Sequence, residues 1–198
     1  MSPFPVNGEK LYEEAVFHGM DLYGLSLSGS RFFSVRFIDC AARDADLSDS
    51  VFDRCVFTGC DLSGAHLAST RWLKTEILDS KLQGSDLSQS RWKESRIRRC
   101  VLAYACLAQS VWQKGCEITR SDLRESILEE MKPGTLRIES SDLSKASVKK
   151  TMLAGMDLST NMLPGISASA DFRELRGALV SVDNAIDLSL LLGIILKR

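Results

Sequence analysis

A bulky apolar residue returns at every fifth position through most of this 198-residue chain. The series runs from Phe17 to Trp112 and resumes at Ile118, after one inserted residue. A helix with 3.6 residues per turn would scatter residues of this spacing around its axis, and a flat strand would place them alternately on two faces. Neither element explains the pattern, which instead indicates a chain that turns after every five residues.

A small residue lies two positions before most of the bulky ones, so the repeating unit is small, polar, bulky, polar, polar. The segments ADLSD, CDLSG, SDLSQ and SDLSK are its clearest copies. In this pattern the chain resembles the pentapeptide-repeat family, whose consensus is A(D/N)LXX, over about residues 15–167. The resemblance implies a right-handed quadrilateral β-helix, in which each unit forms one side and four units form one coil.

A twenty-residue period overlies the five-residue one and independently favours four sides. Phe32, Phe52, Trp72, Trp92 and Trp112 fall in one column of this period. Stacked coils about 4.8 Å apart would place like residues on like, so we expect the aromatic and leucine columns to form the core. The predicted fold is an all-β solenoid, a quadrilateral β-helix with a short C-terminal helix for capping and dimerisation.

Three segments divide the chain: an N-terminal lead-in (1–14), the β-helix (15–180), and a C-terminal helix and strand (181–198). Ser181 or Asp183 is suited to begin the helix, and Gly193 to end it. Residues 194–196 are predicted as a short strand. This C-terminal segment carries more apolar residues than are needed to cover the end of the rod. We therefore predict a homodimer interface, with a monomeric lid as the alternative. The predicted interface residues are Ile186, Leu188, Leu190, Leu191, Leu192, Ile194 and Ile195.

The composition predicts a soluble, cytoplasmic protein. The formal net charge is -1, which disfavours a strongly basic nucleic-acid binder. No apolar run approaches the roughly 18 residues of a membrane-spanning helix, and residues 1–10 lack a signal-peptide pattern. These observations predict no contact with a membrane.

No catalytic, metal or cofactor motif accompanies the repeats. Phosphate-binding loops, zinc-hydrolase motifs and nucleophile elbows are missing from the sequence, and a filled core leaves no substrate cavity. We therefore predict a protein without enzymatic activity, cofactor, metal or small-molecule substrate. Five of the six cysteines occupy the small inward position, and Cys106 lies outward. We expect buried free thiols, the alternative being a disulfide between Cys40 and Cys60.

The repeat register separates the outward charges by side. The basic candidates for partner binding lie on the tryptophan side and the side after it: Arg71, Lys74, Arg91, Lys93, Arg96, Arg98 and Arg99. The acidic candidates lie on the two leucine sides: Asp44, Asp46, Asp49, Asp61 and Asp86. The alternative is that both sets are merely solvated, with the aspartates of the DLS units making hydrogen bonds at the corners.

The tail resembles that of the Qnr and MfpA type of pentapeptide-repeat proteins. The resemblance rests on LRGA before the helix, LGI at its end, NGEKL at residues 7–11 and RIRRCVLAYACL at residues 96–107. It implies a dimeric rod that mimics B-form DNA, binds DNA gyrase or topoisomerase IV, and relieves poisoning by quinolones or peptide toxins. The chain departs from this type in its near-zero net charge and in lacking obvious loop insertions.

Two functional hypotheses follow, and both are non-enzymatic. The first is a protein-binding module, a DNA-mimicking rod that binds a type II topoisomerase through the aspartate side. The alternative is a scaffold, accessory or immunity protein that binds another protein through the basic side. Direct nucleic-acid binding by the basic side is disfavoured because no outward aromatic residues are interleaved with its charges.

Overall fold

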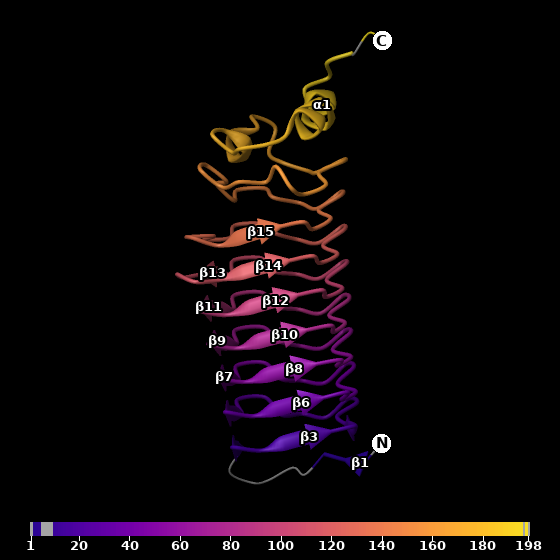
Figure 1. The fold of residues 1–198 in the computed structure, drawn as a ribbon, viewed down its shortest axis with the longest axis vertical. Helices are drawn as coiled ribbons and strands as arrows, with labels where there is room; N and C mark the ends of the chain where they lie inside the picture. The colour runs from indigo at the N-terminus through magenta and orange to yellow at the C-terminus, as the bar shows by residue number, and fades with distance from the viewer. Residues whose placement is uncertain (1, 5–9, 196, 198) are drawn as a thin grey trace.

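The computed structural model describes residues 2–4, 10–195 and 197 of the chain, and within them the coils stack into a rod (Figure 1). The strands of neighbouring coils pair in parallel and in register, as Trp92 with Trp72 shows. A single short α-helix, α1, lies at the C-terminal end of the described rod. The predicted all-β solenoid with a C-terminal helix is therefore confirmed.

Two parallel sheets form two sides of the rod. Side A is a six-stranded sheet. Its strands are β2 (Leu11–Glu13), β5 (Arg31–Phe33), β7 (Val51–Asp53), β9 (Arg71–Leu73), β11 (Arg91–Lys93) and β13 (Val111–Trp112). Side B is a seven-stranded sheet. Its strands are β3 (Val16–His18), β6 (Arg36–Ile38), β8 (Val56–Thr58), β10 (Glu76–Leu78), β12 (Arg96–Arg98), β14 (Glu117–Thr119) and β15 (Arg137–Glu139).

The other two sides are held by single parallel bridges rather than by strands. Side C follows the bridged series Asp21, Ala41, Asp61, Lys81, Val101, Asp122, Asp142 and Met162. Side D follows the series Ser26, Asp46, His66, Asp86, Cys106, Ile127, Ser147 and Ser167. At the N-terminal end, β1 (Ser2–Pro3) pairs with β4 (Met20–Asp21).

Each five-residue unit ends in a corner residue with left-handed backbone. Most of these corner residues are not glycine: Asp44, Arg54 and Lys74 have φ angles of 53°, 55° and 49°. The next residue is the small inward one, and in several units its hydroxyl or thiol bonds to a carbonyl of the coil below. Thr75 Oγ1, for example, donates to the carbonyl oxygen of Phe52 at 3.1 Å. The small residue thus both fits the narrow interior and ties successive coils together.

The aromatic column forms the centre of side A. The indole rings of Trp72, Trp92 and Trp112 stack with centroids 4.7 Å apart at each step. Each Trp Nε1 donates to a hydroxyl two residues earlier, as from Trp92 to Ser90 Oγ at 2.8 Å. The column reaches Tyr12, which lies in the segment predicted as a lead-in. The ring of Tyr12 stacks on that of Phe32.

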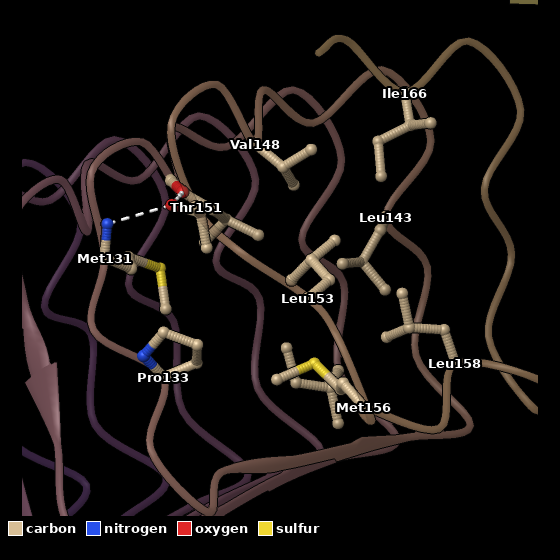
Figure 2. Close-up of a pocket in the computed structure, with 11 residues that line it drawn as sticks. Met131, Pro133, Leu143, Val148, Thr151, Leu153, Met156, Leu158 and Ile166 are labelled. Carbon is tan, nitrogen blue, oxygen red and sulfur yellow. Dashed lines mark hydrogen bonds between the residues drawn. The ribbon is translucent and has the colours of Figure 1, made fainter. Parts of the chain in front are cut away.

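Side chains fill the interior of the described rod. Figure 2 shows the space near the C-terminal end, where Leu143, Leu153 and Leu158 face Met131 and Met156. This space measures about 10 Å³, and a second one around Phe37 and Leu62 is the same size. A cavity of that volume is at the lower limit for one water molecule.

The predicted irregularities interrupt side A without forming a large loop. The inserted residue lies in a turn at Lys114 and Gly115, after β13. In the next coil Lys132 bridges to Val111, but after Pro133 a turn at Gly134 and Thr135 takes the place of a strand. Proline cannot donate to the ladder, so the sheet of side A ends here while side B continues to β15.

The C-terminal segment covers the last coil. A short 3₁₀-helix, η1 (Arg173–Leu175), precedes α1 (Val182–Leu191). Ser181 caps α1 by accepting the Asn184 backbone N–H at 3.1 Å, as predicted. The side-chain Nδ2 of Asn184 donates to the Leu158 and Asn161 carbonyls at 3.1 and 3.0 Å, which fastens the helix to the rod.

The strand predicted after α1 is wrong for the residues that can be checked. Ile194 and Ile195 form no strand, and Leu196 lies outside the described residues. Gly193, with a φ of 71°, turns the chain at the end of the helix. No neighbouring edge then pairs with the described part of this segment, and an isolated apolar segment has no reason to stay extended as a strand.

All six cysteines are free thiols, as predicted. Cys40, Cys55, Cys60, Cys100 and Cys116 are buried in the inward position, and Cys106 is half-buried. Burial raises the pKa of the Cys55 and Cys100 thiols to about 11, so both stay protonated near neutral pH.

Candidate binding surfaces

The aspartates of the DLS units make the corner hydrogen bonds that the sequence suggested. Asp46, Asp61 and Asp86 each accept the backbone N–H two residues ahead, at 3.1, 3.1 and 2.9 Å. The Ser48 hydroxyl also donates to Asp46 and lowers the pKa of that carboxyl. These side chains stabilise the turns of sides C and D, and only part of each carboxylate is left for another molecule.

The remaining two acidic candidates are exposed corner residues. Asp44 and Asp49 have φ angles of 53° and 57°. The Asp44 carboxylate lies over the equivalent corner of the next coil, where a Cβ on Gly64 would come within 2.3 Å of its Oδ1. All five acidic candidates thus form part of the turns or corners of the rod.

The acidic surface is much less densely charged than DNA. From Asp21 to Cys106, sides C and D together carry roughly four net negative charges over roughly 20 Å, taking about 4.8 Å per coil. That is about one charge per 5 Å, whereas B-form DNA carries one per about 1.7 Å. Electrostatic mimicry of a duplex is weak on this surface.

The basic candidates divide into a paired and an unpaired group. On side B, Arg96 bonds to Glu76 at 2.9 Å and lies 3.4 Å from Glu117. Arg98 also contacts Glu117. Arg99, at the corner after β12, binds Asp79 through two nitrogens at 2.6 and 2.7 Å. The three basic candidates of side B are therefore compensated by neighbouring acids.

On side A the basic candidates stand without acidic partners. Among the described residues, no salt bridge reaches Arg71, Lys74, Arg91 or Lys93. Arg71 and Arg91 are exposed and lie directly opposite each other in the parallel pairing of β9 and β11. Like charges in this position repel. Side A therefore presents positive charge that is free to meet a ligand.

A surface groove of about 570 Å³ runs beside these arginines, at the corner between sides D and A. It is lined by Asp49, Ser69, Arg71, Gln89, Arg91, Gln109, Val111, Glu130 and Lys132. Its polar side chains come from the same corner of successive coils. The groove has donors along its length and carboxylates near its two ends.

The predicted dimer-interface residues lie on two different faces of the C-terminal segment. Leu188 and Leu191 are half-buried against the core. Five of the residues are exposed: Ile186, Leu190, Leu192, Ile194 and Ile195. Val182 and Leu179 enlarge this apolar surface, with 79% and 57% exposure. The helix thus covers the rod with one face and leaves another apolar face uncovered.

The described part of the chain contains neither a metal-binding cluster nor a membrane-spanning helix. No group of three or more histidine, cysteine or acidic side chains within it is placed to hold a metal ion. None of its helices has the length and apolar character needed to cross a bilayer.

Comparison with family models accounts for the repeat pattern. The model of a pentapeptide repeat region matches residues 30–107. This stretch is a pentapeptide-repeat region. The matched segment holds β5 to β12 with the corners between them, and so includes every acidic candidate and every basic candidate.

Solved structures similar to the chain include other repeat proteins. QnrB1, a plasmid-mediated fluoroquinolone resistance protein, is 22% identical over 100% of this chain and 97% of that chain, with a TM-score of 0.39. The pentapeptide repeat protein Rfr23 from the cyanobacterium Cyanothece 51142 is 9% identical over 88% and 93%, with a TM-score of 0.45. No curated protein matches the chain. At these scores no functional conclusion follows for this chain.

Sequence reasoning missed the groove beside the pentapeptide-repeat arginines. Gln89 and Gln109 are neutral corner residues, so a search for charge passes over them, and Lys132 lies beyond the inserted residue. Counting corners in steps of twenty, and of twenty-one across the insertion, would have aligned these residues. The pairing of side B was also visible as opposite charges one coil apart, such as Asp79 and Arg99.

Proposed function

We propose that this protein is a non-enzymatic rod that binds an acidic surface of a protein partner through side A. The observation that carries this proposal is the uncompensated pair Arg71 and Arg91 in neighbouring strands. Lys74 and Lys93 add positive charge on the same side, again without a described acidic partner. The filled interior supports a role that depends on the outer surface.

The cysteines support a cytoplasmic setting for this partner. Six free thiols persist most readily in a reducing compartment. The partner would then meet side A as a rigid, flat face, because every coil is tied to the next through backbone hydrogen bonds such as Arg91 N to Thr70 O at 2.9 Å. Rigid surfaces lose little conformational entropy on binding.

Partner capture with matched charge variants tests the proposal. Tagged protein is incubated with lysate of the source organism, and retained proteins are identified by mass spectrometry. The test variant is Arg71→Glu/Lys74→Glu/Arg91→Glu. The control is Arg96→Glu/Arg98→Glu/Arg99→Glu, which makes the same change in net charge on side B. We expect a protein retained by the wild type and the control and lost from the test variant. Identical retained sets for all three would overturn the proposal.

A second candidate function is a DNA-mimicking rod that binds a type II topoisomerase. The observation favouring it is the gathering of Asp44, Asp46, Asp49, Asp61 and Asp86 on sides C and D. The low density of charge on those sides counts against it. Here the partner would be DNA gyrase or topoisomerase IV, met through the acidic surface.

A gyrase supercoiling assay separates this candidate from the first. It is run with and without a quinolone, using the wild type and Asp46→Asn/Asp86→Asn. Topoisomerase binding predicts a changed supercoiling yield or relief of quinolone inhibition by the wild type, weakened in the variant. An unchanged yield at about 10 μM protein would remove the candidate.

A further inference from the structure

The arginine pair of side A is an exception to how the rod treats its charges. Arg71 opposite Arg91 is the only like-charged pair in the strand registers of the described sheets. Elsewhere the rod compensates such a pair: Asp122 bridges to Asp142 on side C, and Arg124 lies 2.7 and 3.8 Å from their carboxylates. Several cations one coil from an acid are paired with it as well, as Lys150 is with Glu130 at 2.8 Å.

The groove beside the pair supplies the other half of a binding site. The side chains of Gln89 and Gln109 line it next to the arginines, and Lys132 lies further along. Gln109 Nε2 donates to Glu130 at 3.2 Å, which leaves its amide oxygen available as an acceptor. Such a site offers guanidinium groups for anions and amides for a peptide backbone.

We propose that this groove binds an extended acidic peptide segment of the partner, with carboxylates on alternate residues facing Arg71 and Arg91. The inference rests on the proposed function, because it names the ligand of the same side. Alternate residues of an extended strand lie about 6.7 Å apart on one face. The two arginines start about 4.8 Å apart at the backbone, and their long side chains diverge under mutual repulsion, so each reaches one carboxylate.

The ends of the groove favour a peptide over a nucleic acid. Asp49 precedes the arginines, and Glu130 lies beyond them in the same coil as Lys132. Only the coils of Arg71 and Arg91 therefore carry a cation of the groove without a carboxylate, over about 10 Å of the rod. A nucleic-acid backbone would bring further phosphates against these carboxylates. The residues lining the groove include no aromatic ring on which a base would stack.

Fluorescence anisotropy with defined probes tests the site. The main probe is a labelled peptide of alternating Thr and Glu, eight residues long. The comparison probes are a peptide of the same composition with its four Glu in one block, and an eight-nucleotide single-stranded DNA. The test variant is Arg71→Gln/Arg91→Gln, and Arg96→Gln/Arg99→Gln is the control with equal change in net charge. Thermal unfolding of both variants establishes that each is folded.

We expect the alternating peptide to bind the wild type at least tenfold more tightly than the test variant, with less than a threefold change for the control. Equal weakening in both variants, or equal affinity for the block peptide, would overturn the site because attraction would then be unspecific. Tighter binding of the DNA would assign the groove to nucleic acid instead. In one further outcome the partner-capture experiment succeeds, with a host protein lost only from the side A variant, while the alternating peptide does not bind the wild type. That combination would overturn this inference and leave the proposed function in place.

Discussion

The indole ring of Trp92 lies 4.7 Å from that of Trp72, with only 3° between the ring planes. Trp92 is fully buried and contacts Trp112 in the same way on its other face. Truncation to alanine would leave a cavity in the middle of the column and expose the Ser90 hydroxyl to it. We expect Trp92→Ala to lower the free energy of unfolding by roughly 3–5 kcal/mol, measured by urea denaturation.

Trp92→Phe is the matched control, because Phe52 already occupies the same column one coil below Trp72. The phenylalanine ring keeps the stack, so the variant is destabilised only by its smaller side-chain volume and by the lost hydrogen bond to Ser90. We expect a cost under about 2 kcal/mol. Equal costs for the two variants would contradict the assignment of the stability to stacking and burial.

Gly134 is required by a close approach of the backbone. A Cβ at this position would lie 2.2 Å from the carbonyl oxygen of Trp112, and its φ is 54°. Gly84 has a similar φ of 65° but nothing within 4 Å of its Cβ position. We expect Gly134→Ala to cost about 3 kcal/mol or more, and Gly84→Ala about 1 kcal/mol, in urea denaturation. Equal destabilisation by both would show that backbone strain alone matters.

The fold was predictable from the sequence because two residue classes share one period. The inward positions and the tryptophan column follow from register alone, whereas the free thiols followed from the expectation of a reducing compartment. The pairing of charges across coils was accessible to the same counting. The chain past Gly193 was not, since a run such as Ile194–Ile195 is apolar in a strand, a coil or an interface alike, and only a neighbouring edge would decide. The groove was missed because its amides carry no charge, although counting corners would have aligned its residues.

Acid should weaken the C-terminal end of the rod through Glu174. This carboxylate is buried and accepts hydrogen bonds from the Ser169 hydroxyl and from the Lys150 backbone N–H at 2.7 Å. Burial alone would raise its pKa, but these bonds outweigh burial and lower the pKa from 4.5 to about 2. A lowered pKa in the folded state stabilises above pH about 4.5, and that stabilisation disappears as the pH falls toward about 2.

Comparison with Glu174→Gln isolates this contribution. Between pH 7 and 5 we expect the wild type to be the more stable protein in thermal unfolding. The difference in melting temperature should narrow as the pH falls from about 4.5 to about 2. A difference that is constant over this range would mean that the charge of Glu174 is not what the hydrogen bonds stabilise.

Removing one arginine from side A should stabilise the unliganded rod. Arg91→Gln relieves the repulsion with Arg71, and we expect the melting temperature to rise by about 1–2 °C at low salt. Arg99→Gln removes the partner of Asp79 and should lower the melting temperature. Both differences should shrink in about 1 M salt, where the Debye length is near 3 Å. A lower melting temperature for Arg91→Gln would indicate that an acid compensates this arginine.

The exposed apolar face of α1 should decide the oligomeric state. Ile186 and Leu190 lie one helical turn apart and are 45% and 59% exposed, so they form one stripe. If a second copy covers this stripe, Ile186→Asp/Leu190→Asp will convert a dimer into a monomer in light scattering without changing the fold by circular dichroism. The control, Asp183→Asn/Asp187→Asn, changes charge on the same helix and should leave the dimer mass unchanged. A wild type with the mass of a monomer at about 100 μM would overturn the predicted homodimer and favour a lid on a single rod.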